Sequence, residues 1–105
     1  MDYTQKKGIN FDLDTGALKE YYLDGDWHNA YHDIRNFLCE NEFEHIQGSG
    51  YHSIVPMSEA KAMGIIYKMT NELSWINYCV NICTISDVPE RYDTSHVFYE
   101  RRENR

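Results

Sequence analysis

The stretch of residues 8–16 constrains the fold of this chain more than any other part. Apolar and polar side chains alternate along it, the apolar ones being Ile9, Phe11 and Leu13 and the polar ones Asn10, Asp12 and Asp14. This period of two is the pattern of a β-strand with one buried face. Carboxylates at the end of a central strand are held by the sheet and open to solvent, so they can bind a metal ion or accept protons. Asp12 and Asp14 are therefore candidate metal ligands, and Asp12 is also a candidate catalytic base.

The length and the charge of the chain limit what it can do. Its 105 residues suit a single two-layer domain, which we expect to span residues 1–105. Nine tyrosines favour an interface, because Tyr combines an apolar ring with a polar hydroxyl. The formal net charge of −7 argues against broad attraction to nucleic acid, since phosphate binding depends on Lys and Arg. Any contact with nucleic acid must therefore be local.

The remaining segments alternate between helical and extended patterns. They predict a helical turn over 17–23, an amphipathic helix from the capping residue Asp26 to Asn41, extended chain over 43–47 and 51–54, a helix from the capping residue Ser58 to Leu73, and a strand over 78–85. We expect residues 90–105 to form an edge strand at 97–99 and a charged tail. This order predicts an α+β protein with a ferredoxin-like β-α-β-β-α-β arrangement, in which two helices lie on one face of an antiparallel sheet.

The segment Gly48-Ser49-Gly50 separates the two extended stretches. Two glycines around a serine allow positive φ and a tight reversal of the chain. The serine hydroxyl is then carried by a backbone that can approach a ligand closely. A plain hairpin turn explains the same residues equally well, so the sequence leaves both interpretations open.

Histidines and cysteines give weaker signals. His28 and His32 stand one helical turn apart and could hold a metal ion with a third ligand, but no residue at a supporting spacing supplies one. A solvated pair on the polar side of the helix is the favoured interpretation, and the other histidines receive no role. Three cysteines without Cys-x-x-Cys spacing indicate buried free thiols. The chain also has no apolar run long enough for a membrane span, and its first residues lack the apolar core of a signal peptide, so we expect a cytoplasmic protein without a membrane partner.

Four short motifs, in this order along the chain, resemble the virulence-associated protein D family of bacterial toxins. They are Phe11-Asp12-Leu13-Asp14, Ala17-Leu18-Lys19, Asn29-Ala30-Tyr31-x-Asp33-Ile34-Arg35 and Gln47-Gly48-Ser49-x-Tyr51. The Asn-Ala-Tyr and Gln-Gly-Ser segments are the more specific of the four. The resemblance implies a homodimeric ferredoxin-like ribonuclease that acts on RNA and is paired with an antitoxin protein. It also implies a distant relation to the small CRISPR adaptation proteins of the same fold.

The resemblance also implies which residues carry the activity, namely Asp12 at the end of the first strand and Ser49 of the Gln-Gly-Ser segment. We expect Asp12, present once in each of two copies, to act at the scissile phosphate as a metal ligand or proton acceptor, and Ser49 to donate a hydrogen bond to that phosphate. Arg35, Gln47 and Tyr51 are the expected substrate-binding residues, with Arg35 stabilising charge.

The sequence leaves two questions open, namely whether cleavage needs a metal ion and whether the protein is an enzyme. Mg²⁺ or Mn²⁺, bound by Asp12 and Asp14, is the natural cofactor if cleavage is metal-assisted. A metal-free attack by the 2′-hydroxyl of RNA would instead use a general base such as Asp12. The alternative to an enzyme is a non-catalytic dimeric scaffold that binds a protein or nucleic-acid partner, as the CRISPR adaptation relatives do.

Overall fold

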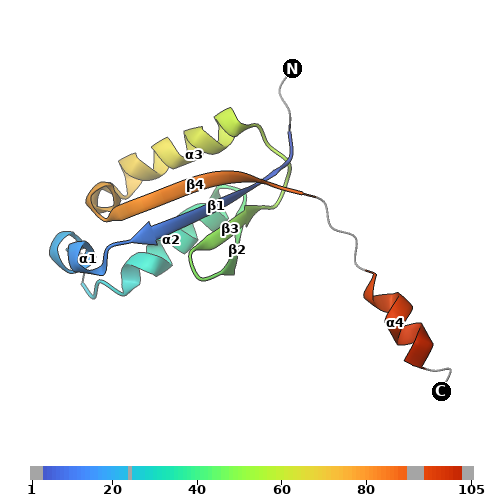
Figure 1. Cartoon of the computed structure of the whole chain (residues 1–105). Helices are drawn as coiled ribbons and strands as arrows, with labels where there is room; N and C mark the ends of the chain where they lie inside the picture. The colour runs from blue at the N-terminus through green and yellow to red at the C-terminus, as the bar shows by residue number, and fades with distance from the viewer. Residues whose placement is uncertain (1–3, 24, 90–93, 103–105) are drawn as a thin grey trace.

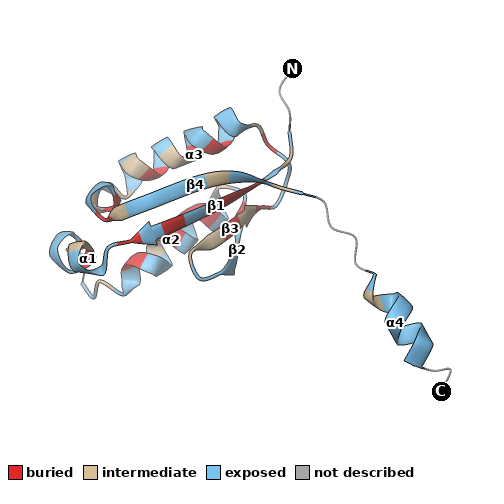
Figure 2. Cartoon of the chain, viewed as in Figure 1, coloured by how far each residue is buried: buried red, intermediate tan, exposed pale blue. Residues whose placement is uncertain are grey.

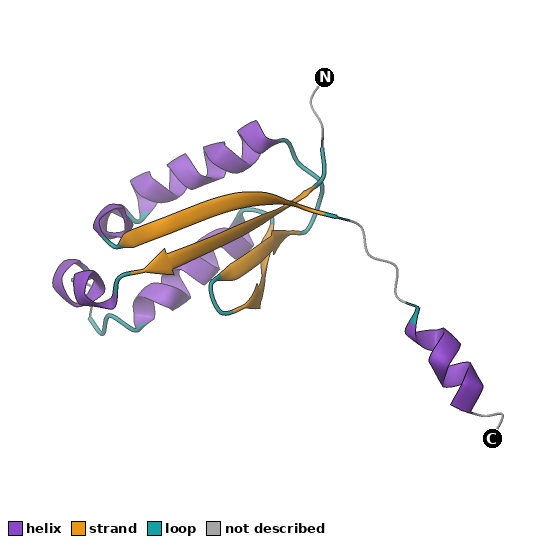
Figure 3. Cartoon of the chain, in the orientation of Figure 1, coloured by secondary structure: helices purple, strands orange, loops and turns teal. Residues whose placement is uncertain are grey.

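The computed structural model describes residues 4–23, 25–89 and 94–102. Within these ranges an antiparallel sheet of four strands runs in the order β2-β3-β1-β4 (Figure 1 and Figure 3). The strands are β1 (Lys6–Leu13), β2 (Phe43–Gln47), β3 (Gly50–Ser53) and β4 (Val80–Val88). The helices are α1 (Thr15–Tyr21), α2 (Asn29–Glu40), α3 (Glu59–Glu72), the 3₁₀ helix η1 (Ser74–Tyr78) and α4 (Ser95–Arg102). The predicted α+β class is confirmed, and no helix in the described ranges is long and apolar enough to cross a membrane.

Strand β1 lies inside the sheet, as its alternating pattern predicts. Ile9 pairs with Tyr51 of β3 on one side and with Ile85 of β4 on the other. Ile9 and Phe11 are buried on the face that carries the core. Because successive side chains of a strand point to opposite faces, Asp12 lies on the other side of the sheet, which we call the open face. The strand therefore separates its apolar residues from its carboxylate.

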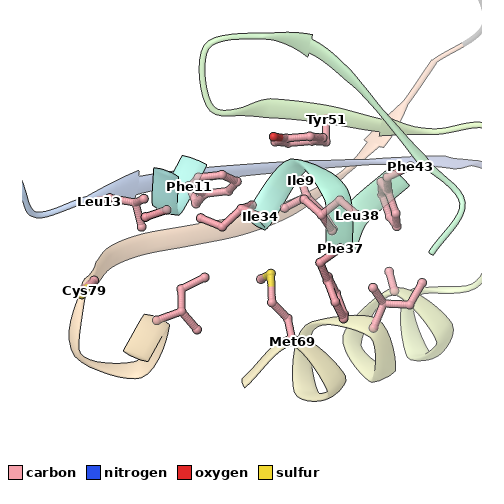
Figure 4. Close-up of a cluster of buried hydrophobic side chains, with 14 of the residues drawn as sticks. Ile9, Phe11, Leu13, Ile34, Phe37, Leu38, Phe43, Tyr51, Met69 and Cys79 are labelled. Atoms are coloured by element: carbon pink, nitrogen blue, oxygen red, sulfur yellow. The ribbon is translucent and has the colours of Figure 1, made fainter. Parts of the chain in front are cut away.

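The two long helices bury their apolar sides in a single core with β1. The buried residues of the two helices are Ala30, Ile34, Phe37 and Leu38 in α2 and Ala62, Ile65 and Met69 in α3. They form one cluster with the buried side chains of β1 (Figure 4). Figure 2 shows that the outer sides of both helices are exposed. Burial of each large apolar side chain contributes about 1.5–3 kcal/mol, so the core fixes which side of α2 faces outward.

The helix starts agree with the sequence at α3 but not at α2. Ser58 caps α3 as predicted, because its side chain accepts a hydrogen bond from the backbone N–H of Lys61 at 3.1 Å. The prediction that Asp26 caps α2 is wrong, because this helix begins at Asn29 and His28 occupies its capping position. A turn at residues 27–28 comes first, in which Asp26 accepts a hydrogen bond from the backbone N–H of His28 at 3.0 Å.

The predicted edge strand at 97–99 is also wrong. These residues belong to helix α4, which stands apart from the sheet in Figure 1. The error has a physical reason, because a short apolar run cannot by itself distinguish a strand from a helical segment. Val97, Phe98 and Tyr99 are all exposed in α4. Residues 90–93 and 103–105 of the predicted C-terminal segment lie outside the described residues.

The three cysteines are free thiols, as predicted, but only one is buried. Cys79 lies in the core beside η1, and burial raises the pKa of its thiol. Cys39 and Cys83 are exposed, in contrast to the prediction, because Cys39 lies on the outer side of α2 and Cys83 lies on the outermost strand.

Candidate active site

An open pocket lies between helix α2 and the turn that joins β2 to β3. Its volume is about 490 Å³. Three of the predicted site residues line it, namely Ser49, Arg35 and Tyr51. They come from the turn, from α2 and from β3, so only the folded chain brings them together. Their convergence makes this pocket the candidate active site.

The outer side of the α2 segment supplies a guanidinium and two imidazoles to the pocket. His28, His32 and Arg35 line the pocket at intervals of about one helical turn. Ile34 and Leu38 hold this orientation because they bury the opposite side of the helix in the core. An arginine guanidinium can bind a phosphate through two parallel hydrogen bonds. In a chain with a net charge of −7, Arg35 supplies the pocket with the local positive charge that nucleic-acid binding would need.

The turn between β2 and β3 is tight, as the glycines predict. Gly48 has a φ of 51°, a left-handed conformation that favours glycine. The ring Nε2 of His45 donates a hydrogen bond to the carbonyl oxygen of Gly48 at 2.8 Å. The backbone N–H of Phe11 donates to the carbonyl oxygen of Ser49 at 3.3 Å. These two hydrogen bonds hold the turn against the sheet and keep Ser49 at the edge of the pocket.

Tyr51 forms part of the buried wall of the pocket. Its ring stacks on Phe11 with 5.8 Å between the ring centroids (Figure 4). The centroid of the His45 ring lies 5.0 Å from that of Tyr51. Burial raises the pKa of Tyr51, and the nearby charge of Arg35 offsets part of that rise. The phenol therefore stays protonated near neutral pH and can donate a hydrogen bond, whereas it is poorly suited to act as a base.

Two other predicted site residues lie outside this pocket. Asp12 is exposed on the open face of β1, where its Oδ2 lies 3.5 Å from Nδ2 of Asn81. Gln47, at the end of β2, is exposed and is not among the lining residues. Within one chain the sheet thus separates the carboxylate of Asp12 from Arg35 and Tyr51.

The predicted metal ligands do not form a metal site with the pocket. The carboxylate of Asp14 accepts a hydrogen bond from the backbone N–H of Ala17 at 3.0 Å and caps α1. The residues that line the pocket include no carboxylate, whereas Mg²⁺ and Mn²⁺ prefer oxygen ligands. Within the described ranges, no three or more His, Cys, Asp or Glu residues are grouped so that they could hold a metal ion. The donor set therefore does not fit either ion in this pocket.

The histidines were assigned no role from the sequence, yet three of the five line the pocket. His28 and His32 could have been linked to Arg35, because the three residues share one side of a helix at one-turn spacing. No comparable signal exists for His45, which reaches the pocket only because the turn folds back toward α2.

One arginine, three imidazoles and three hydroxyl groups line the open pocket of this small α+β protein, and groups of these kinds suit a phosphate-bearing ligand. No family model matches the chain. The chain is similar to Endoribonuclease VapD 2 of Riemerella anatipestifer, with 28% identity over 85 residues that cover 81% of this chain and 90% of that protein. This similarity confirms the resemblance to the virulence-associated protein D family, as a distant one.

Proposed function

We propose that this protein is an endoribonuclease of a toxin–antitoxin system and that it binds an RNA phosphodiester in the pocket beside α2. The observation that carries the proposal is the convergence of Ser49, Arg35 and Tyr51 in one pocket. The similarity to a protein named as an endoribonuclease supports the same assignment.

Each of the three residues has a role that suits its chemistry. The guanidinium of Arg35 pairs with the phosphate and stabilises the negative charge that builds up on it during cleavage. The hydroxyl of Ser49 donates a further hydrogen bond to a phosphate oxygen. Tyr51 donates from the wall of the pocket, since its raised pKa keeps the phenol protonated. Gln47, exposed next to the turn, contacts an adjoining nucleotide.

A homodimer is part of the proposal. Strand β4 ends the sheet on one side, and its Ile82 pairs with Asp12 and is 60% exposed. An edge strand with exposed apolar side chains is suited to pairing with a second copy. Such a dimer would carry two copies of Asp12 on the same side of the joined sheet, where the carboxylate could accept a proton.

The same resemblance extends the proposal to the fold family and the cellular setting. The strand order β2-β3-β1-β4, with α2 and α3 packed into one core, supports a ferredoxin-like arrangement. We propose the cytoplasm as the site of action and an antitoxin protein as a further partner.

The test is incubation of the purified protein with labelled RNA, with and without divalent metal. We expect cleavage by the parent, weaker cleavage by Arg35→Gln, and none by a mock-purified sample. Binding of RNA without cleavage, with and without divalent metal, would contradict the proposed ribonuclease activity and favour the non-catalytic scaffold. Phe98 and Tyr99, which are exposed on α4, could contact a partner of such a scaffold.

A further inference from the structure

The histidines of the pocket are arranged for proton transfer. His45 donates from Nε2 to the carbonyl oxygen of Gly48, 2.8 Å away. Because a carbonyl oxygen can only accept, Nε2 carries the proton and Nδ1 is the basic nitrogen of the neutral ring. The turn thus fixes the tautomer of His45 and leaves the ring with one nitrogen that can take up a proton.

His28 has the opposite arrangement. Its Nδ1 lies 2.6 Å from Oδ1 of Asp26, and a carboxylate also only accepts, so Nδ1 carries the proton and Nε2 points elsewhere. The pKa of Asp26 is lowered, first by the hydrogen bond from the backbone N–H of His28 and then by the bond from its ring. The carboxylate therefore stays ionised beside the imidazole. An aspartate that orients a histidine in this way suits a ring that carries positive charge during a reaction.

From this geometry we infer that the pocket cleaves RNA without a metal, by transphosphorylation, with His45 as general base and His28 as general acid. The inference rests on the proposed function and names its chemistry. Nδ1 of His45 removes the proton of the 2′-hydroxyl, and the 2′-oxygen forms a bond to phosphorus. The bond from phosphorus to the 5′-oxygen breaks, and that oxygen takes a proton from Nε2 of His28, whose ring begins the step as an imidazolium protonated on both nitrogens and ends it neutral, with its proton on Nδ1. The products are a 2′,3′-cyclic phosphate and a 5′-hydroxyl.

Arg35 and Tyr51, two other groups of the pocket, fit supporting roles. Arg35 lines the same pocket as both histidines and can hold the phosphate, and Tyr51 is a poor base because its pKa is raised. Asp12 is exposed on the open face of β1 and is not among the residues that line the pocket. Asp26 is a positioning residue, which acts through the ring of His28.

The first experiment determines the ends of the cleaved RNA in the presence of EDTA. We expect cleavage to persist, with 2′,3′-cyclic phosphate and 5′-hydroxyl ends, and to stop when the 2′-hydroxyl at the cleavage site is replaced by hydrogen. Cleavage that yields 3′-hydroxyl and 5′-phosphate ends, or that is lost with EDTA, would overturn the inference and leave the proposed function standing. A parent protein that cleaves no RNA would overturn both.

The second experiment compares His45→Gln and His28→Gln with the control His96→Gln, whose side chain is exposed on α4 and outside the pocket. We expect about a hundredfold loss of kcat in each of the first two variants and no change in the control. Binding of a non-cleavable 2′-O-methyl RNA should be retained by all three, which also reports on their folding. Asp26→Asn should lower kcat less, with rescue by Asp26→Glu. Parent-like kcat in His45→Gln or His28→Gln would overturn the roles assigned to them.

Discussion

The substitution Arg35→Gln removes the single full positive charge among the residues that line the pocket while leaving the fold intact. Arg35 is exposed, and Gln has a similar helix propensity, so helix α2 should be unaffected. A hydrogen bond to a charged group contributes about 1.5–3 kcal/mol, and about 1.4 kcal/mol corresponds to a tenfold change in affinity. Because an exposed pair is weakened by solvent, we expect the lower end of this range, a loss of about tenfold.

The assay is fluorescence anisotropy with a labelled 2′-O-methyl RNA over a series of salt concentrations. The parent should lose affinity as salt rises, and the slope of log K against log salt should become shallower by about 0.7 in Arg35→Gln if the side chain contacts one phosphate of a single strand. Arg101→Gln, in the exposed helix α4, is the matched control and should behave like the parent. An unchanged Kd and an unchanged slope in Arg35→Gln would refute the phosphate contact.

Three further predictions concern the framework around the pocket. Ile34→Ala, at a fully buried position of α2, should lower the free energy of unfolding by about 2–5 kcal/mol in urea titrations; a loss below about 1 kcal/mol would contradict the packing described for α2. Asp14→Ala should lower it by about 1 kcal/mol through loss of the α1 cap but leave RNA cleavage unchanged, whereas lost cleavage in a folded protein would restore Asp14 as a site residue. Sedimentation at micromolar concentration should give a dimer, and a monomer would remove the proposed pairing of the two Asp12 carboxylates.

The sequence predicted the sheet and its two long helices because their signals are local. The alternation of Ile9, Phe11 and Leu13 and the capping serine Ser58 each depend on a few neighbouring residues, and the structure confirms both. The predicted start of α2 was wrong because an aspartate is favoured both as a helix cap and in a turn. Its presence at position 26 therefore does not distinguish the two structures.

The candidate site was only partly predictable, for a different reason. Ser49 lies within a recognisable glycine turn, Tyr51 follows it and Arg35 lies in a specific motif, so these residues could be named from the sequence. His45 could not, because its place in the pocket depends on how the turn folds toward α2. Alternation along β1 places Asp12 on the face opposite to Phe11. It does not state which of the two faces α2 and the turn between β2 and β3 will cover, so it could not predict that the pocket excludes Asp12.

The location of bound RNA can be measured directly from the ring resonances of the five histidines in a titration with 2′-O-methyl RNA. His28, His32 and His45 line the pocket, whereas His52 pairs with Gly8 and shares the open face with Asp12, and His96 is exposed on α4. The account predicts that the resonances of the first three shift together, saturably and in parallel with the anisotropy, while those of His52 and His96 do not move. Shifts confined to His52 would place the RNA on the open face and contradict the pocket as the active site.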